Sequence, residues 1–167
     1  MLDSAMKGIN SAHLASVFKT EDEQLGSAVP FVLGGLDRDE KVVYVVESHT
    51  KDQIIESLMK VRDIQWALDA HRIEFLTAEE TYLKGGKFEP DRMIALLDSI
   101  ETAALAEGYS GLRGAGEMTW YSPNKPGAGT LMEYEARLNL RYPKSRMNIL
   151  CQYDESAFDA SILLDAV

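Results

Sequence analysis

The segment from residue 41 to residue 47, Lys-Val-Val-Tyr-Val-Val-Glu, constrains the fold more than any other part of the sequence. It is β-branched and apolar on both faces, which is typical of a strand buried between two layers in a parallel sheet. Further strands are predicted at 13–18, 72–77, 109–118 (broken by glycines) and 147–153. The segments between them carry apolar residues at helical spacing. This alternation predicts an α/β domain: a mostly parallel sheet of about five strands with helices on both faces.

Several signals indicate where the helices begin. The segments 20–23 (Thr-Glu-Asp-Glu) and 50–53 (Thr-Lys-Asp-Gln) have the spacing of a capping box. Pro90 suits the first position of a helix. Pro30 lies inside the first predicted helix and predicts a kink or a late start, because proline removes one backbone hydrogen bond. Residues 62–71 fit no single element, and further helices are predicted at 130–140 and 158–167.

Length and charge limit the classes of function. The 167 residues suit one domain, and we expect residues 1–11 to form a lead-in to a single domain at 12–167. Lys plus Arg number 17 and Asp plus Glu number 27, a net charge of −10. This balance argues against direct binding of nucleic acid or of an anionic membrane. No apolar run approaches the ~20 residues of a membrane span, and the N-terminus lacks the apolar core of a signal peptide. We therefore expect a cytoplasmic protein.

The candidate binding residues follow from the predicted sheet. Ligands of open parallel sheets bind outside the carboxyl ends of the strands. Glu117 closes a predicted strand, where it is either a polar anchor in an apolar pocket or a solvated carboxylate. The aromatic side chains after it either wall a pocket or pack in the core. The predicted ligand-binding residues are Glu117, Thr119, Trp120, Tyr121, Tyr153, Asp154 and His49, although His49 also fits a loop and Asp154 a helix cap.

Other chemistries lack their motifs. There is no phosphate-binding G-x-x-x-x-G-K-[ST] sequence, and the turn after the first strand is acidic. Cys151 lies in an apolar strand, so we expect an inert buried thiol, and we expect His13 and His71 to be structural. A single cysteine cannot form an internal disulfide, and no Cys/His cluster has the spacing of a zinc site. We therefore expect no catalytic residue, no metal and no cofactor.

Several short segments, taken in order, resemble the MEDS family, the methanogen/methylotroph sensory domain named in part for the regulator DcmR. The resemblance covers about residues 12–167, and its segments are specific in combination. They are HL at 13–14, VPF at 29–31, the strand 41–46, ETYL at 80–83, FEPDRM at 88–93, GEMTW at 116–120, EYE at 133–135 and CQYD at 151–154.

The resemblance implies a non-catalytic sensory domain with a KaiC/RecA-like core that lacks a working phosphate loop. It implies a small hydrocarbon derivative as ligand, and a histidine kinase or a transcription regulator as partner. We also expect association with further copies of the chain. In this comparison, the strand that ends at Glu117 takes the place of the strand that carries a metal-binding carboxylate in ATPases. Two alternatives stay open: a degenerate KaiC-like nucleotide-binding module, and an enzyme that uses Glu117 as acid or base.

Overall fold

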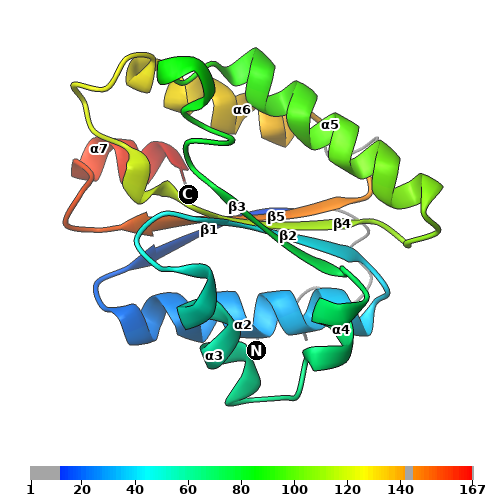
Figure 1. The fold of residues 1–167 in the computed structure, drawn as a ribbon. Helices are drawn as coiled ribbons and strands as arrows, with labels where there is room; N and C mark the ends of the chain where they lie inside the picture. Colours follow the sequence, from blue (N-terminus) through cyan, green and yellow to red (C-terminus); the bar gives the residue numbers. More distant parts are fainter. Residues whose placement is uncertain (1–11, 142–144, 167) are drawn as a thin grey trace.

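A computed structural model describes residues 12–141 and 145–166, and its centre is a five-stranded sheet (Figure 1). All four strand pairs are parallel, and the order across the sheet is β1-β5-β4-β2-β3. The predicted α/β class is confirmed. The predicted lead-in, 1–11, lies outside the described residues. The strands are β1 (Ala12–Phe18), β2 (Lys41–Val46), β3 (Ile73–Thr77), β4 (Leu112–Glu117) and β5 (Met147–Asp154).

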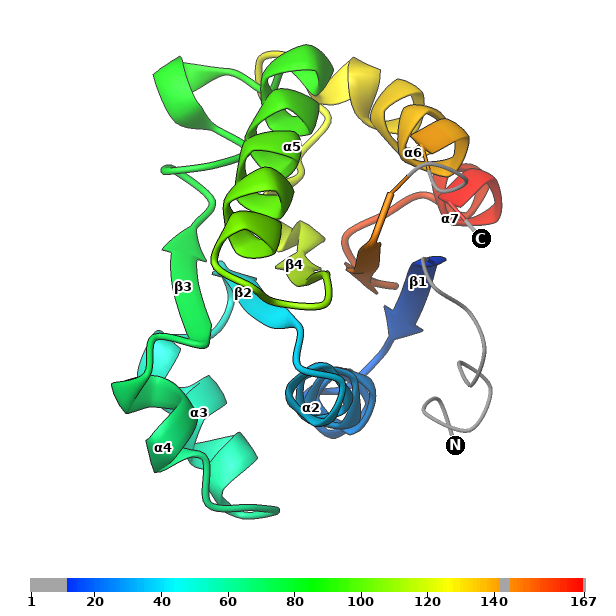
Figure 2. The same ribbon diagram turned by 90° about the vertical axis from the view of Figure 1, so that its right-hand side faces the viewer.

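Helices cover both faces of the sheet, as the view turned by 90° in Figure 2 shows. One face is covered by α2 (Glu21–Asp37), α3 (Lys51–Met59) and α4 (Gln65–Asp69). The opposite face is covered by α5 (Pro90–Ala106), α6 (Leu131–Arg141) and α7 (Ala160–Ala166). Short 3-10 turns are η1 (Lys84–Gly86), η2 (Met118–Trp120) and η3 (Ala128–Thr130).

The predicted helix starts agree with the structure. Thr20 and Thr50 accept backbone hydrogen bonds at the starts of α2 and α3, and α5 begins at Pro90. The late start predicted from Pro30 is wrong, because α2 runs continuously through it. Burial of the neighbouring helix face against the sheet outweighs the loss of one backbone bond. The final helix begins at Ala160 rather than 158, because Phe158 packs in the core.

The glycines of β4 allow close packing and do not interrupt the strand. β4 pairs with β2 on one side and β5 on the other. A Cβ atom on Gly116 would lie 2.2 Å from the hydroxyl of Tyr82, so only glycine leaves room for this ring. β4 is therefore a central strand on whose surface an aromatic cluster packs.

The two faces of the sheet have different cores. The core under α2, α3 and α4 is mainly aliphatic. The core under α5, α6 and α7 is aromatic at the carboxyl-terminal side of β4, where Tyr82, Phe88 and Trp120 pack together. The stacking of Trp120 on Tyr82, with ring centroids 5.2 Å apart, belongs to this core.

A buried ion pair links the amino-terminal end of the sheet to α2. Arg113 on β4 pairs with Glu40, and both side chains are buried. Arg113 also donates to the carbonyl oxygen of Phe31 at 3.0 Å, and Asn148 on β5 donates to Glu40 at 3.0 Å. Gly35 leaves space for the arginine, since a Cβ atom there would lie 2.6 Å from Arg113 Cδ.

Replacing Arg113 tests this link. Arg113→Met leaves Glu40 as a buried charge without its cation, and we expect the free energy of unfolding to fall by about 3–5 kcal/mol. Urea denaturation gives the value. Arg137→Met is the control, because Arg137 pairs with carboxylates at the surface and should cost at most about 1 kcal/mol. Equal losses in the two variants would contradict the prediction.

Candidate functional site

The strand order creates a crevice beside the carboxyl ends of β2 and β4. These strands are neighbours, but the chain leaves β2 toward β3 and leaves β4 toward β5, on opposite sides. Such a reversal is the usual ligand position in open α/β sheets. Glu117 is the last residue of β4, and residues 47–49 directly follow β2.

The carboxylate of Glu117 holds the turn after β2. Its Oε2 accepts backbone N–H bonds from Glu47 at 2.7 Å, Ser48 at 2.7 Å and His49 at 3.1 Å. The Ser48 hydroxyl donates to the same oxygen at 3.0 Å. Glu117 is 0% exposed, so these bonds replace water as the solvation of its charge. The end of β4 and the start of α3 are thereby fixed to one another.

His49 continues this network toward the surface. Its Nδ1 lies 2.8 Å from Glu117 Oε1, and its Nε2 lies 3.3 Å from Glu21 Oε1. The ring therefore bridges a buried carboxylate on β4 and an exposed one on α2. Its orientation is set by Glu117, which makes Glu117 a positioning residue for the surface beside it.

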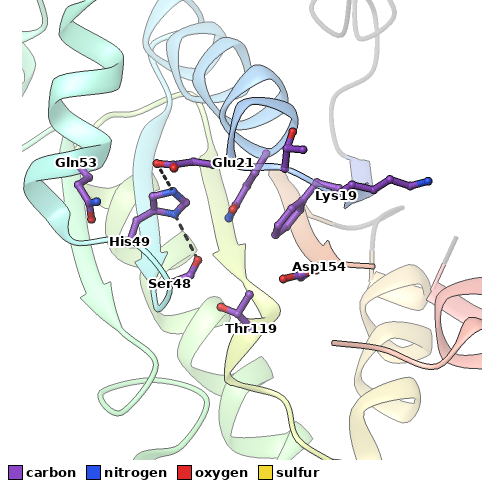
Figure 3. A pocket seen from close by; sticks show the side chains of 10 residues that line it. Lys19, Glu21, Ser48, His49, Gln53, Thr119 and Asp154 are labelled. Carbon is purple, nitrogen blue, oxygen red and sulfur yellow. Dashed lines mark hydrogen bonds and ion pairs between the residues drawn. The ribbon is translucent and has the colours of Figure 1, made fainter. Parts of the chain in front are cut away.

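A cavity of about 270 Å³ lies where His49 faces α2 (Figure 3). Its lining is predominantly polar and comes from the carboxyl ends of four strands and from two helix starts. Two lining atoms are buried and have no hydrogen-bond partner among the described residues: Gln24 Nε2 and Thr119 Oγ1. The lining residues are Phe18, Lys19, Thr20, Glu21, Gln24, Ser48, His49, Gln53, Thr119 and Asp154.

The start of α2 is closed to phosphate by its own side chains. Thr20 Oγ1 accepts from the backbone N–H of Glu23, and Glu23 Oε2 accepts from the backbone N–H of Lys19 at 2.7 Å. Glu21, Asp22 and Glu23 add three carboxylates to this turn. A bound polyphosphate would therefore meet occupied donors and negative charge.

The structure brings together only part of the predicted set. His49, Thr119 and Asp154 line the cavity, and Asp154 also accepts bonds from the backbone and hydroxyl of Ser156. Glu117 lies behind His49, outside the lining.

The predicted aromatic walls belong to the core on the opposite face. Trp120 is 1% and Tyr153 0% exposed, and Tyr121 stacks on Phe158 with centroids 4.7 Å apart. They do not line this cavity. Trp120 and Tyr121 lie at η2 and Tyr153 lies on β5, and all three pack in or against the core under α5, α6 and α7.

Sequence reasoning missed the lining residues that lie on helices. Glu21 and Gln24 are one helical turn apart on α2, and Gln53 is the third residue of α3 and the last residue of its capping box. Sequence reasoning could have found them, because the first turn of a helix that directly follows a strand also faces the crevice at the strand ends.

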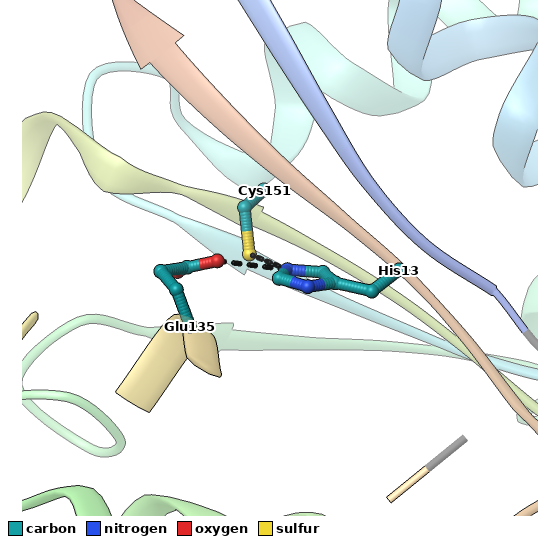
Figure 4. Close-up of side chains that lie close together, drawn as sticks. All are labelled: His13, Glu135 and Cys151. Carbon is teal, nitrogen blue, oxygen red and sulfur yellow. Dashed lines mark hydrogen bonds and ion pairs between the residues drawn. The ribbon is translucent and has the colours of Figure 1, made fainter. Parts of the chain in front are cut away.

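A second polar cluster lies between the sheet and α6, on the face of the sheet that carries the aromatic core (Figure 4). His13 on β1, Glu135 on α6 and Cys151 on β5 each place one metal-ligating atom within 4.8 Å of the others. Burial lowers the pKa of His13, but the hydrogen bond and charge of Glu135 outweigh this and raise it. Burial and the charge of Glu135 raise the pKa of the Cys151 thiol. His13 and Cys151 are 138 residues apart, so no local spacing could reveal the cluster.

Comparisons with known proteins agree with this architecture. The family model described as "MEDS: MEthanogen/methylotroph, DcmR Sensory domain" matches residues 12–167. A KaiC-like protein from the hyperthermophilic archaeon Pyrococcus horikoshii OT3 has a similar structure, with a TM-score of 0.55 and 11% sequence identity. The match covers 87% of this chain and 61% of that chain, and it confirms the predicted KaiC/RecA-like fold. No curated protein matches. Within the described ranges, every helix is too short or too polar to cross a bilayer.

Glu117 and Glu21 both contact His49, and we predict that Glu117 contributes much more than Glu21 to the stability of the domain. Glu117→Gln removes the charge that accepts three backbone N–H bonds, and we expect a loss of about 2–3 kcal/mol in urea denaturation. Glu21→Gln is the control, because Glu21 is exposed, and its loss should stay within about 0.5 kcal/mol. A Glu117→Gln protein as stable as the control would show that the network does not hold the turn.

Burial predicts slow alkylation of Cys151. With chelator present, iodoacetamide should modify the folded protein at least about 100-fold more slowly than the unfolded protein, because reaction requires local opening. A Leu140→Cys variant supplies an internal control, since Leu140 is 81% exposed. Mass spectrometry should then show one fast and one slow adduct per chain; two fast adducts would refute the prediction.

Proposed function

Since the chain belongs to the MEDS family of sensory domains, we propose that it senses a small organic molecule bound in the cavity at the carboxyl ends of the strands. We propose further that it binds this molecule without converting it. The ligand is a short hydrocarbon derivative that carries at least one oxygen able to accept a hydrogen bond.

The observation that carries this proposal is the pair of unpartnered polar atoms in the cavity. Gln24 is 2% exposed and its Nε2 has no acceptor among the described residues, and the Thr119 hydroxyl is likewise without a partner. An unsatisfied buried donor costs about 1–3 kcal/mol. A ligand oxygen that reaches either atom would give it a partner and recover that free energy.

The charges and the size of the cavity favour a small ligand of low charge. Lys19 contributes one positive charge, and Glu21 and Asp154 contribute two negative charges, so these three lining residues have a net charge of −1. The volume of about 270 Å³ lies below the usual range of about 300–1,000 Å³ for sites of drug-sized ligands.

The two alternative functions have less support. A nucleotide-binding module would agree with the KaiC-like fold, but the capped and acidic start of α2 opposes phosphate. An enzyme that uses Glu117 as acid or base requires access to its oxygens. Glu117 is 0% exposed, and donors from residues 47–49 and Tyr44 already occupy both oxygens.

A ligand in this cavity would contact three elements of the domain at once. Gln24 lies on α2, Thr119 follows β4, and His49 precedes α3. A ligand shifts a conformational equilibrium only by its difference in affinity for the two states, and about 1.4 kcal/mol changes the ratio tenfold. We propose a histidine kinase or a transcription regulator as the receiver of this signal, and association with further copies of the chain.

Gln24→Leu separates ligand binding from folding. The substitution keeps the side chain's volume and removes the unpartnered amide, so stability without ligand should be unchanged or higher by up to about 1–2 kcal/mol. Binding of short-chain alcohols, aldehydes and carboxylates, followed by ¹⁵N chemical shifts, should weaken by about tenfold or more. Thr119→Val should act similarly.

The matched control is Arg137→Ala, which alters a depression between α5 and α6 and should leave binding unchanged. Shifts that cluster away from Gln24 and Thr119 would place the ligand elsewhere. Binding of Mg²⁺-ATP with a dissociation constant below about 10 µM would favour the nucleotide alternative. Steady conversion of a bound compound by the purified protein would overturn the sensory proposal.

A further inference from the structure

The cluster of His13, Glu135 and Cys151 has the composition and the spacing of a metal site. His13 Nε2 lies 2.9 Å from Glu135 Oε2 and 3.4 Å from Cys151 Sγ. Around a tetrahedral zinc ion with ordinary bond lengths, such donor pairs lie roughly 3.3–3.6 Å apart. Small movements of side chains would therefore admit an ion between the three atoms.

The far side of the histidine ring is already oriented. His13 Nδ1 lies 3.0 Å from the side-chain oxygen of Asn139 on α6. A hydrogen bond from Nδ1–H to that oxygen leaves Nε2 as the nitrogen that faces Glu135 and Cys151. Metal-binding histidines are commonly held in this way, with one nitrogen donating to a carbonyl oxygen and the other ligating.

Glu135 supplies a separate observation that points to a cation. Its side chain is 3% exposed, and its Oε2 lies 2.9 Å from His13 Nε2. Among the described residues it accepts no backbone N–H bond, whereas the buried Glu117 accepts three. A buried carboxylate without such donors is costly unless a positive charge compensates it. A divalent ion at the centre of the cluster would do so.

We propose that His13, Glu135 and Cys151 bind one divalent ion of the zinc class, at a site distinct from the cavity beside His49. The mixed nitrogen, oxygen and sulfur ligands suit Zn²⁺ or Co²⁺, whereas Mg²⁺ and Ca²⁺ prefer oxygen alone. Binding displaces the thiol proton, and any proton on His13 Nε2, to solvent. Three protein ligands leave one tetrahedral position for water or a small ligand.

The surroundings allow an ion to reach this site. β1 is the edge strand of the sheet, and Asn139 is exposed on α6 directly beyond the His13 ring. The ion therefore has to pass only the outer layer of the domain. The buried hydroxyl of Tyr153 belongs to the same polar neighbourhood as Glu135 and Cys151 and could donate a hydrogen bond to a molecule in the open position.

A rival interpretation treats the same atoms as a nucleophile. A histidine that contacts a cysteine on one side and an asparagine on the other can activate the cysteine for catalysis. His13 lies between Cys151 and Asn139 in this way. That chemistry requires a thiolate that substrate can reach. Cys151 is 0% exposed and lies against the carboxylate of Glu135, which opposes a second negative charge. The cluster favours a cation over a reactive thiolate.

The test uses the purified full chain, stripped with chelator and titrated with Co²⁺ and then Zn²⁺. We expect about one Co²⁺ per chain with a dissociation constant below about 10 µM, and a thiolate-to-cobalt charge-transfer band in the near ultraviolet. Cys151→Ser should abolish this band, and His13→Asn and Glu135→Gln should weaken binding by at least about tenfold. His71→Asn is the control. His71 is exposed in the turn between α4 and β3, and β3 is the edge strand opposite β1; asparagine tolerates its positive φ of 52°.

X-ray absorption of the wild-type protein loaded with Zn²⁺ keeps the test independent of variant folding. One sulfur and two nitrogen or oxygen ligands from the protein would support the site. Coordination without sulfur, a charge-transfer band that survives Cys151→Ser, or a dissociation constant above the threshold would overturn it. Because the ligands lie outside the cavity beside His49, loss of Co²⁺ binding would leave the proposed sensing of organic ligands untouched.

Discussion

A buried carboxylate that accepts backbone N–H groups from a neighbouring turn holds the ligand-facing end of this domain together. Glu117 closes the central strand, and the turn after β2 is folded around its oxygens. This turn also positions the His49 ring, which contacts Glu117 on one side and Glu21 of α2 on the other. The Glu117 carboxylate therefore links β4, the turn after β2 and, through His49, the start of α2. The cavity lies on the far side of His49 from Glu117. The structure gives Glu117 the role of a support behind the cavity wall.

Much of the fold was accessible from sequence because local rules and tertiary packing agree. The apolar run of β2, the two threonine caps and Pro90 each placed an element correctly. The site was less accessible. Trp120 and Tyr153 occur near strand ends, yet whether such a ring enters a cavity or the core depends on the helices packed above it. The cluster around His13 joins three distant elements, so its existence follows only from the strand order.

The start of α2 explains how a KaiC-like fold can host a different ligand chemistry. The fold directs several strand ends and helix starts into one crevice, whatever their side chains are. In this chain, Thr20 accepts from the backbone N–H of Glu23 in the first turn of α2, and Glu23 accepts from the backbone N–H of Lys19 just before the helix. The same architecture thus presents a polar cavity of modest size in place of a phosphate cradle. The topology determines where the cavity lies, and the residues at the helix starts determine its chemical character.

The ion pair between Arg113 and Glu40 has a consequence for how such domains diverge. It lies at the amino-terminal end of β4, and the cavity lies beyond the carboxyl-terminal end of the same strand. Substitutions at Gln24, Gln53 or Thr119 consequently leave the buried charges at the other end intact. The cavity residues can therefore change while the ion pair persists, so the chemistry of the cavity is separable from the stability of the scaffold.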